Sequence, residues 1–178
     1  KDRMYHLNKT KDCLNKGINL IHIWEDDWNY KQDIVKSIIL NKLGDSKRIF
    51  ARKCKIKIPN NKEVREFLVS NHIQGFVGSK VKIGLYFEDE LVSLMTFGNL
   101  RKSLGQKSTE GSYELLRFCN KVGYSVVGGA GKMFKYFLNN YYVNEVISYS
   151  DNSRGVGNLY KQLGFELVSE TVPNYYWV

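Results

Sequence analysis

Apolar and polar residues alternate along several segments from residue 80 onward, and this alternation predicts β-strands. The pattern covers residues 80–87, 91–99 and 113–120, with an acidic turn between the first two, and an apolar run follows at 145–150. Residues 132–140 carry apolar side chains at helical spacing. Strands and helices mixed in this order predict an α/β domain with a mixed sheet.

The first third of the chain has a different pattern. We expect a polar helix at 8–15, an apolar strand at 18–24 and a helix from about 30 to 43, with a helix stop at Gly44. A strand over 47–58 and a helix over 62–71 follow, and the chain closes with a short helix at 158–165 and extended runs after 166. The strand at 18–24 has too few neighbours to form a sheet. We therefore predict two domains, residues 1–44 and 47–178.

A glycine-rich turn precedes the helix at 132–140. It comprises Gly128, Gly129, Ala130, Gly131 and Lys132. Glycines at a helix start let the backbone approach a ligand, and the free N–H groups there face an anion with the positive end of the helix dipole. The alternative is a tight turn that packs a helix closely against a sheet.

Positive charge is concentrated near the N-terminus. The formal net charge is +9, and residues 1–60 hold 14 basic and 7 acidic side chains. This excess favours a polyanionic partner such as nucleic acid. On the predicted strand over 47–58 one face would carry a lysine ladder, with arginines nearby. The predicted DNA-binding residues are Arg48, Arg52, Lys53, Lys55 and Lys57. A solvated surface, or protection of an edge strand, is the alternative.

Other features narrow the possible chemistry. The three cysteines are scattered, which suggests reduced thiols and predicts no metal site. No apolar run is long enough to cross a membrane. Glu114 is a carboxylate on an apolar strand, which suits a general base for an amine or, alternatively, a structural salt bridge.

The glycine turn and the segment Asn158-Leu159-Tyr160, which continues to Leu163-Gly164-Phe165, resemble the GNAT acyltransferase superfamily. The resemblance implies a GNAT-like fold over residues 47–178, with acetyl-CoA or another acyl-CoA as cofactor. It implies that the turn holds the pyrophosphate, that Tyr160 protonates the leaving thiolate, and that His72 is a candidate acid or base beside the substrate cleft. Where that family has Gln or Arg before the first glycine, this chain has Ser125 or Val126, depending on the alignment.

Residues 1–44 resemble the C-terminal end of nuclease domains related to the very-short-patch-repair endonuclease, a restriction-endonuclease-like fold. The resemblance rests on Tyr5-His6, Lys9-Thr10, Cys13, Gly17-Ile18, residues 20–23 and residues 25–28. Nearly the whole chain resembles phage-encoded Hef-like homing endonuclease proteins. This implies DNA as partner, an upstream nuclease domain in cis, and the cytoplasm of a phage-infected host. The metal-holding acids of that family lie upstream, so we expect no DNA cleavage from this chain alone.

Two hypotheses follow. In the first, the GNAT-like domain is an acyl-CoA-dependent N-acyltransferase that modifies an amine, such as one on a nucleobase. In the second, the same fold is a non-catalytic DNA-binding module that targets the endonuclease. An acetyltransferase that acts on a protein or small molecule unrelated to DNA is a third possibility.

Overall fold

The computed structural model describes residues 3–101, 109–155 and 157–173. The chain divides into two compact units: one is Lys31–Tyr149, and the other combines Lys1–Tyr30 with Ser150–Val178. The predicted domain limits, residues 1–44 and 47–178, stay a prediction. No helix in the described part of the chain is both long and apolar enough to cross a lipid bilayer.

The unit Lys31–Tyr149 is built on a five-stranded sheet with the order β2-β3-β4-β5-β7. Neighbours from β2 to β5 are antiparallel, and β5 and β7 are parallel. The strands are β2 (Lys55–Lys57), β3 (Val81–Phe87), β4 (Glu90–Gly98), β5 (Ser112–Asn120) and β7 (Glu145–Ser148). The prediction of a mixed α/β fold with a mixed sheet is confirmed, including the strands at 80–87, 91–99 and 113–120.

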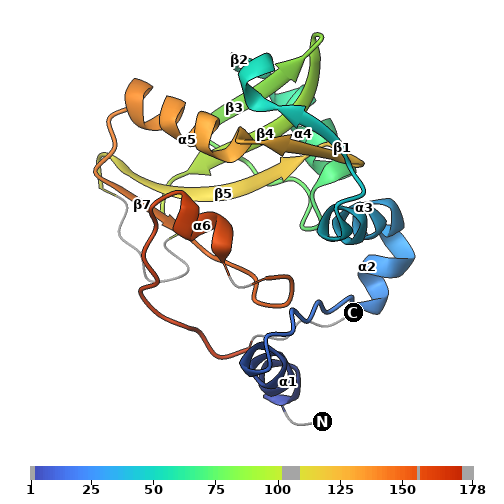
Figure 1. Cartoon of the computed structure of the whole chain (residues 1–178). Helices are drawn as coiled ribbons and strands as arrows, with labels where there is room; N and C mark the ends of the chain where they lie inside the picture. Colours follow the sequence, from blue (N-terminus) through green and yellow to red (C-terminus); the bar gives the residue numbers. More distant parts are fainter. Residues whose placement is uncertain (1–2, 102–108, 156, 174–178) are drawn as a thin grey trace. The chain divides into compact units, whose positions relative to one another are not determined.

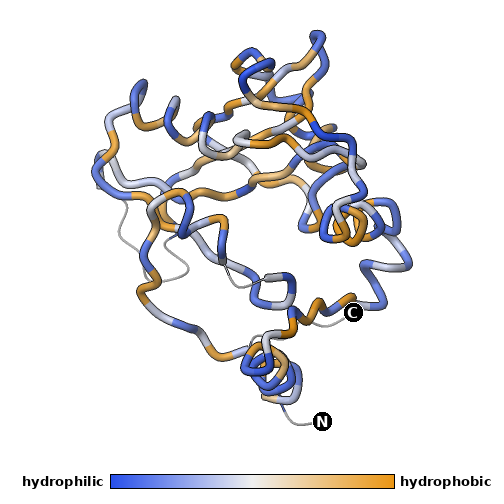
Figure 2. Tube along the Cα trace, viewed as in Figure 1, coloured by the Kyte–Doolittle hydropathy of each residue, from blue (hydrophilic) through white to orange (hydrophobic). Residues whose placement is uncertain are grey.

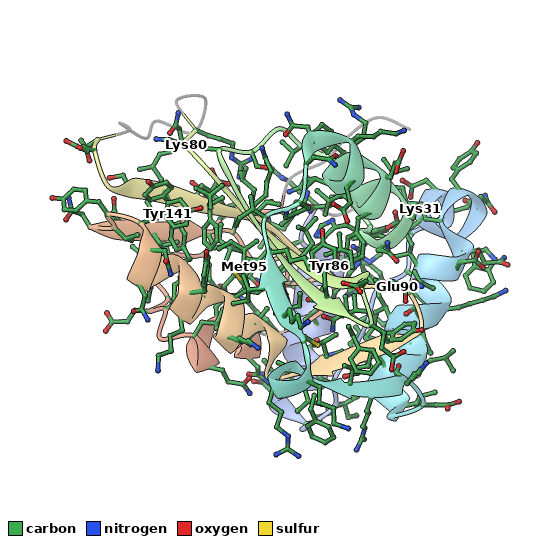
Figure 3. The ribbon with its side chains drawn as sticks, turned by 90° about the horizontal axis from the view of Figure 1, so that it is seen from above. Lys31, Lys80, Tyr86, Glu90, Met95 and Tyr141 are labelled. Atoms are coloured by element: carbon green, nitrogen blue, oxygen red, sulfur yellow. The ribbon has the colours of Figure 1, made fainter. Side chains whose placement is uncertain are left out.

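Two helices lie on opposite faces of this sheet (Figure 1). On one face, α5 (Gly129–Asn140) packs on β3 and β4, where the Phe137 and Phe97 rings stack with centroids 3.7 Å apart. On the other, α4 (Asn61–Asn71) contributes to a cluster that includes Leu94 of β4. Successive strand residues point to opposite faces, so β4 supplies both layers. Hydrophobic residues follow its course in Figure 2, and Met95 lies mid-sheet in Figure 3.

A second, two-stranded sheet pairs β1 (Lys47–Phe50) in parallel with β6 (Tyr124–Val127). The predicted continuous strand over 47–58 is therefore wrong. A 3-10 turn, η1 (Ala51–Lys53), separates β1 from β2, because the chain leaves the β6 partner and joins β3 instead. The alternation of side chains stops at this turn, so the lysine ladder is broken. β6 was not predicted from the sequence.

The unit of Lys1–Tyr30 with Ser150–Val178 contains α1 (Tyr5–Asn15), α2 (Glu25–Tyr30) and α6 (Asn158–Gln162). The predicted strand at 18–24 is wrong, because that segment pairs with no strand among the described residues. The His22 N–H instead donates to the Ser153 carbonyl at 2.8 Å. Residues 166–173 form no strand, and the rest of the predicted extended tail lies outside the described residues. The helix predicted from about 30 begins at Gln32, as α3 (Gln32–Leu43).

Candidate functional site

The glycine-rich turn joins β6 to α5. Gly128 has a φ of 76°, a left-handed conformation that glycine adopts without steric cost. The Lys132 N–H donates to the Gly128 carbonyl at 3.0 Å and closes the first turn of the helix. The N–H groups of residues 129–131 therefore precede the intrahelical ladder, at the positive end of the helix dipole. This end of α5 has the polarity that an anion requires.

The glycines of this turn differ in what surrounds them. A Cβ at Gly129 would lie 3.1 Å from Cγ1 of Val126, so this glycine allows close packing of α5 on β6. A Cβ at Gly131 would meet no atom within 4 Å, and Gly131 is exposed. Ala130 is buried. Both interpretations of the turn therefore have a residue to support them: Gly129 packs the helix, and Gly131 leaves its start open.

Lys132 does not face outward from the turn. Its Nζ donates to the Ala51 carbonyl at 2.9 Å and to the Cys54 carbonyl at 2.6 Å. These contacts fasten α5 to the segment around η1. They also explain part of the break in the predicted strand, because the carbonyls of Ala51 and Cys54 accept from a side chain. A role for Lys132 in phosphate binding stays a prediction.

The sheet opens beside β5. The ladder between β5 and β7 ends at the Leu115–Ser148 pair. Leu116 is an extra residue opposite β4 and forms a β-bulge. Beyond the bulge β5 continues to Asn120 beside β4, and no described strand pairs with its other edge. This edge can accept an extended ligand through backbone hydrogen bonds.

Glu114 lies on β5 just before the bulge and is only 3% exposed. Arg101 binds both of its carboxylate oxygens: Nε donates to Oε2 at 2.9 Å, and Nη2 lies 2.6 Å from Oε1. The Arg101 guanidinium also lies 4.9 Å from the centroid of the Tyr149 ring. The structure thus contains the salt bridge that the sequence analysis gave as the alternative. The role of general base stays a prediction, and it requires Arg101 to release the carboxylate.

Arg117 lies on the same strand and was given no role by the sequence analysis. Its Nε donates to the Gly75 carbonyl at 3.2 Å and its Nη1 to the Leu116 carbonyl at 2.8 Å. Burial lowers the pKa of Arg117, and the nearby Arg101 charge lowers it further, whereas Glu114 opposes the shift. The sequence signal that could have drawn attention to it is an arginine on an otherwise apolar strand.

His72 ends α4 and shapes the loop that follows. Its Nδ1 accepts the Gln74 N–H at 3.1 Å, and its carbonyl accepts the Gly75 N–H at 2.8 Å. Both bonds stabilise the turn. The carbonyl of Ile73, the residue after His72, accepts a hydrogen bond from the Lys31 ammonium at 2.7 Å. The predicted acid or base role of His72 stays a prediction.

Tyr160 lies on α6, which begins after Gly157 in a left-handed conformation with a φ of 73°. Its ring meets the Phe165 ring edge-on at 5.6 Å, and its carbonyl accepts the Phe165 N–H at 2.9 Å. Tyr160 belongs to the unit that includes Ser150–Val178, whereas the glycine turn and Glu114 belong to Lys31–Tyr149. The proposed proton donor and the proposed cofactor turn are thus carried by different units.

The predicted DNA-binding residues lie on β1, η1 and β2. Arg48, Arg52, Lys53 and Lys55 are exposed, and we call these four the basic surface. The Arg52 guanidinium lies 5.1 Å from the centroid of the Phe50 ring.

Lys57 differs from the basic surface, because its charge has an acidic partner. Its Nζ lies 2.7 Å from the Asp89 carboxylate, and this hydrogen bond lowers the pKa of Asp89. Lys57 also lies over the Tyr86 ring at 4.9 Å. We therefore expect Lys57 to contribute less to anion binding than the basic surface does.

The segment that resembles a nuclease end carries a hydrogen-bonded histidine. Thr10 Oγ1 and His22 Nε2 lie 2.7 Å apart, and the His6 ring meets the His22 ring edge-on at 5.2 Å. Asp27 is buried and paired with Arg154. Within the described ranges, no group of three or more His, Cys, Asp or Glu side chains is arranged to hold a metal ion.

The arrangement of the sheet and its helices is that of an acyltransferase-like α/β fold. A solved structure of a GNAT-family acetyltransferase from Streptococcus pneumoniae matches it with a TM-score of 0.50. The match covers 70% of this chain and 97% of that one, at 16% sequence identity. No family model matches the sequence, and no curated protein does. The chain therefore has a GNAT-like fold, as predicted, and the likeness to a nuclease domain stays a prediction.

Proposed function

We propose that the chain is an acyl-CoA-dependent N-acyltransferase. The observation that carries this proposal is the open start of α5 at Gly131, on a fold shared with a known acetyltransferase. Free N–H groups and the helix dipole would bind the pyrophosphate of acetyl-CoA or another acyl-CoA there. The unpaired edge of β5 would hold the extended arm of the same cofactor through backbone hydrogen bonds.

The remaining residues would serve proton transfer. As an amine attacks the thioester carbonyl, the carbon–sulfur bond breaks, the thiolate gains a proton and the amine loses one. Tyr160 would donate the proton to the thiolate, and Glu114 or His72 would accept the proton from the amine. For Glu114 this requires the bidentate bond to Arg101 to open.

Calorimetric titration with acetyl-CoA tests the cofactor site. We expect micromolar binding by the wild-type protein and a loss of at least about tenfold in Gly131→Val, because a side chain at this open position would block the pyrophosphate. Asn139→Val, an exposed change on the same helix, is the matched control and should bind normally. Equal affinities for Gly131→Val and the wild type would refute the assignment of the turn.

A DNA-binding module is the second candidate, and the basic surface favours it. Its four side chains are exposed and come from consecutive elements, an arrangement suited to phosphate contacts. This proposal includes the context that the sequence resemblance implies: residues 1–44 as the end of a nuclease domain, catalytic acids upstream, and the cytoplasm of a phage-infected host. An acceptor unrelated to DNA is the remaining option for the transferase.

Duplex binding measured by fluorescence anisotropy at several salt concentrations tests this candidate. The triple variant R52A/K53A/K55A should bind more weakly, with a salt slope lower by about 2.7, since each phosphate contact contributes about 0.9. K42A/K62A/K80A removes equal charge at exposed positions outside the basic surface and is the control. An equal loss in both variants would mean that only net charge matters.

Nuclease activity is tested on the same material. Incubation of duplex DNA with the chain and magnesium or manganese should leave the DNA intact. Metal-dependent hydrolysis of a phosphodiester needs carboxylates that hold the ion. DNA-cleaving activity that co-elutes with the protein in a second purification step would contradict this expectation.

A further inference from the structure

A cluster of three charged side chains lies around the bulge of β5, where Glu114 and Arg117 come from the strand and Arg101 from the segment after β4. Arg101 binds both oxygens of Glu114. Arg117 is left with two neutral carbonyls, those of Gly75 and Leu116. Over the described residues no carboxylate pairs with Arg117, so the cluster carries one positive charge in excess.

This excess is costly for folding. A partly buried guanidinium without a counter-ion loses hydration that neutral carbonyls replace only in part. The neighbouring Arg101 adds repulsion, and the lowered pKa of Arg117 has the same two causes. An arrangement of this kind is typical of binding sites, where a ligand supplies the missing charge.

Within the part of the chain that the structure describes, some donors of the cluster have no acceptor. The Arg117 contacts engage Nε and Nη1, and the Arg101 contacts to Glu114 engage Nε and Nη2. A guanidinium has further N–H groups in the same plane. Thr96, the register partner of Arg117, is fully buried, and its Oγ1 has no hydrogen-bond partner among the described residues. Half of the Arg101 side chain is exposed, so solvent reaches the cluster.

We propose that Arg117, together with Arg101, binds an oxyanion group, a carboxylate or a phosphate, carried by the acyl acceptor. Planar guanidinium groups match such oxyanions with paired N–H donors. An anion here would compete with Glu114 for Arg101 and so release the Glu114 carboxylate. The acceptor class rests on the proposed transferase function, whereas the anion site itself does not.

Side-chain Nε–H resonances of arginine, followed by NMR on the whole chain, test the site directly. The probes are inorganic phosphate and acetate, each titrated at constant ionic strength. We expect the Arg117 signal to shift and saturate with at least one probe, while Arg65, an exposed side chain on α4 outside the basic surface, serves as the internal reference. The probe that saturates at lower concentration distinguishes a phosphate-bearing from a carboxylate-bearing acceptor. Shifts of Arg117 that never saturate, or that run parallel to those of Arg65, would overturn the proposal.

Two variants separate binding from folding. Arg117→Lys keeps the charge and loses the planar fork, so anion affinity should fall by about tenfold with the fold retained. Glu114→Gln removes the competing carboxylate, so affinity should rise by about tenfold. Unchanged affinity in both folded variants would contradict the site. Acetyl-CoA titration of the same samples reports on the transferase proposal separately, because the glycine turn is intact in each.

Discussion

The two units of the chain differ in what they bury. Within the described residues, every buried hydrophobic side chain belongs to Lys31–Tyr149, from Ile34 to Phe137. In the other unit, Asp27 is buried, whereas Leu167 and Val168 are 77% and 93% exposed. Because burial of apolar area is the dominant stabilising contribution, the sheet unit holds most of the folding free energy. In the other unit, hydrogen bonds and aromatic ring contacts hold the segments between the helices.

Truncating one side chain in each unit tests this difference in burial most directly. Phe137→Ala should lower the free energy of unfolding by about 3–5 kcal/mol, because the ring is fully buried and a cavity would remain. Leu167→Ala should change it by less than about 0.5 kcal/mol. Urea denaturation followed by circular dichroism measures both. A large effect of Leu167→Ala would show that the exposed segment has a partner in solution.

The glycine turn allows a finer test inside the sheet unit. Gly129→Ala should lower the free energy of unfolding by about 1–3 kcal/mol, because the added methyl group would crowd Val126. Gly131→Ala should raise it by about 0.5–1 kcal/mol, since alanine is the better helix former and space is open. Thermal unfolding of the two proteins gives the comparison. Destabilisation by both changes would mean that Gly131 is also a packing residue.

In the other unit, we expect a change of pH to affect stability less than the substitutions above do. Burial lowers the pKa of His22 below its ordinary value of 6.5, electrostatic interactions with His6 and Lys9 lower it further, and the interaction with Asp151 opposes the shift. The unfolded chain therefore binds the proton more readily. The contribution of neutral His22 to stability is complete above pH 6.5, and it is lost as the pH falls through the lower folded-state pKa.

Tryptophan fluorescence should detect this loss, because the Trp24 ring stacks on His22 at 5.9 Å. We expect the fluorescence to change below pH 6.5 while the core around Phe137 stays folded. The fluorescence change should be absent in His22→Phe. A fluorescence change of the same size and midpoint in that variant would assign the titration to another group.

Alternation and helical spacing were sufficient for the central strands and for α4 and α5, because the partners of these elements bury the apolar residues that make up the pattern. The same reasoning failed for residues 18–24 and 47–58. An apolar run becomes a strand only where a neighbour supplies hydrogen bonds, and sequence spacing does not show the neighbour. Here η1 redirects the chain, and β6 appears as the partner of β1.

The candidate site shows the same difference between what the sequence predicts and what only the structure reveals. The glycines were visible in the sequence, and their chemistry at a helix start follows from the backbone alone. The roles of single side chains were not visible: Lys132 turns to two carbonyls, Lys57 to Asp89, and Arg101 to Glu114.

By itself, then, the sequence determined an α/β fold, a glycine-rich helix start and an uneven positive charge. The tertiary structure decided which charges are neutralised and which remain in excess. The physical reason is that propensity and periodicity act over a few residues, whereas charge pairing and burial depend on groups far apart in the chain. Arg117 and Gly75, which are 42 positions apart, are one such pair.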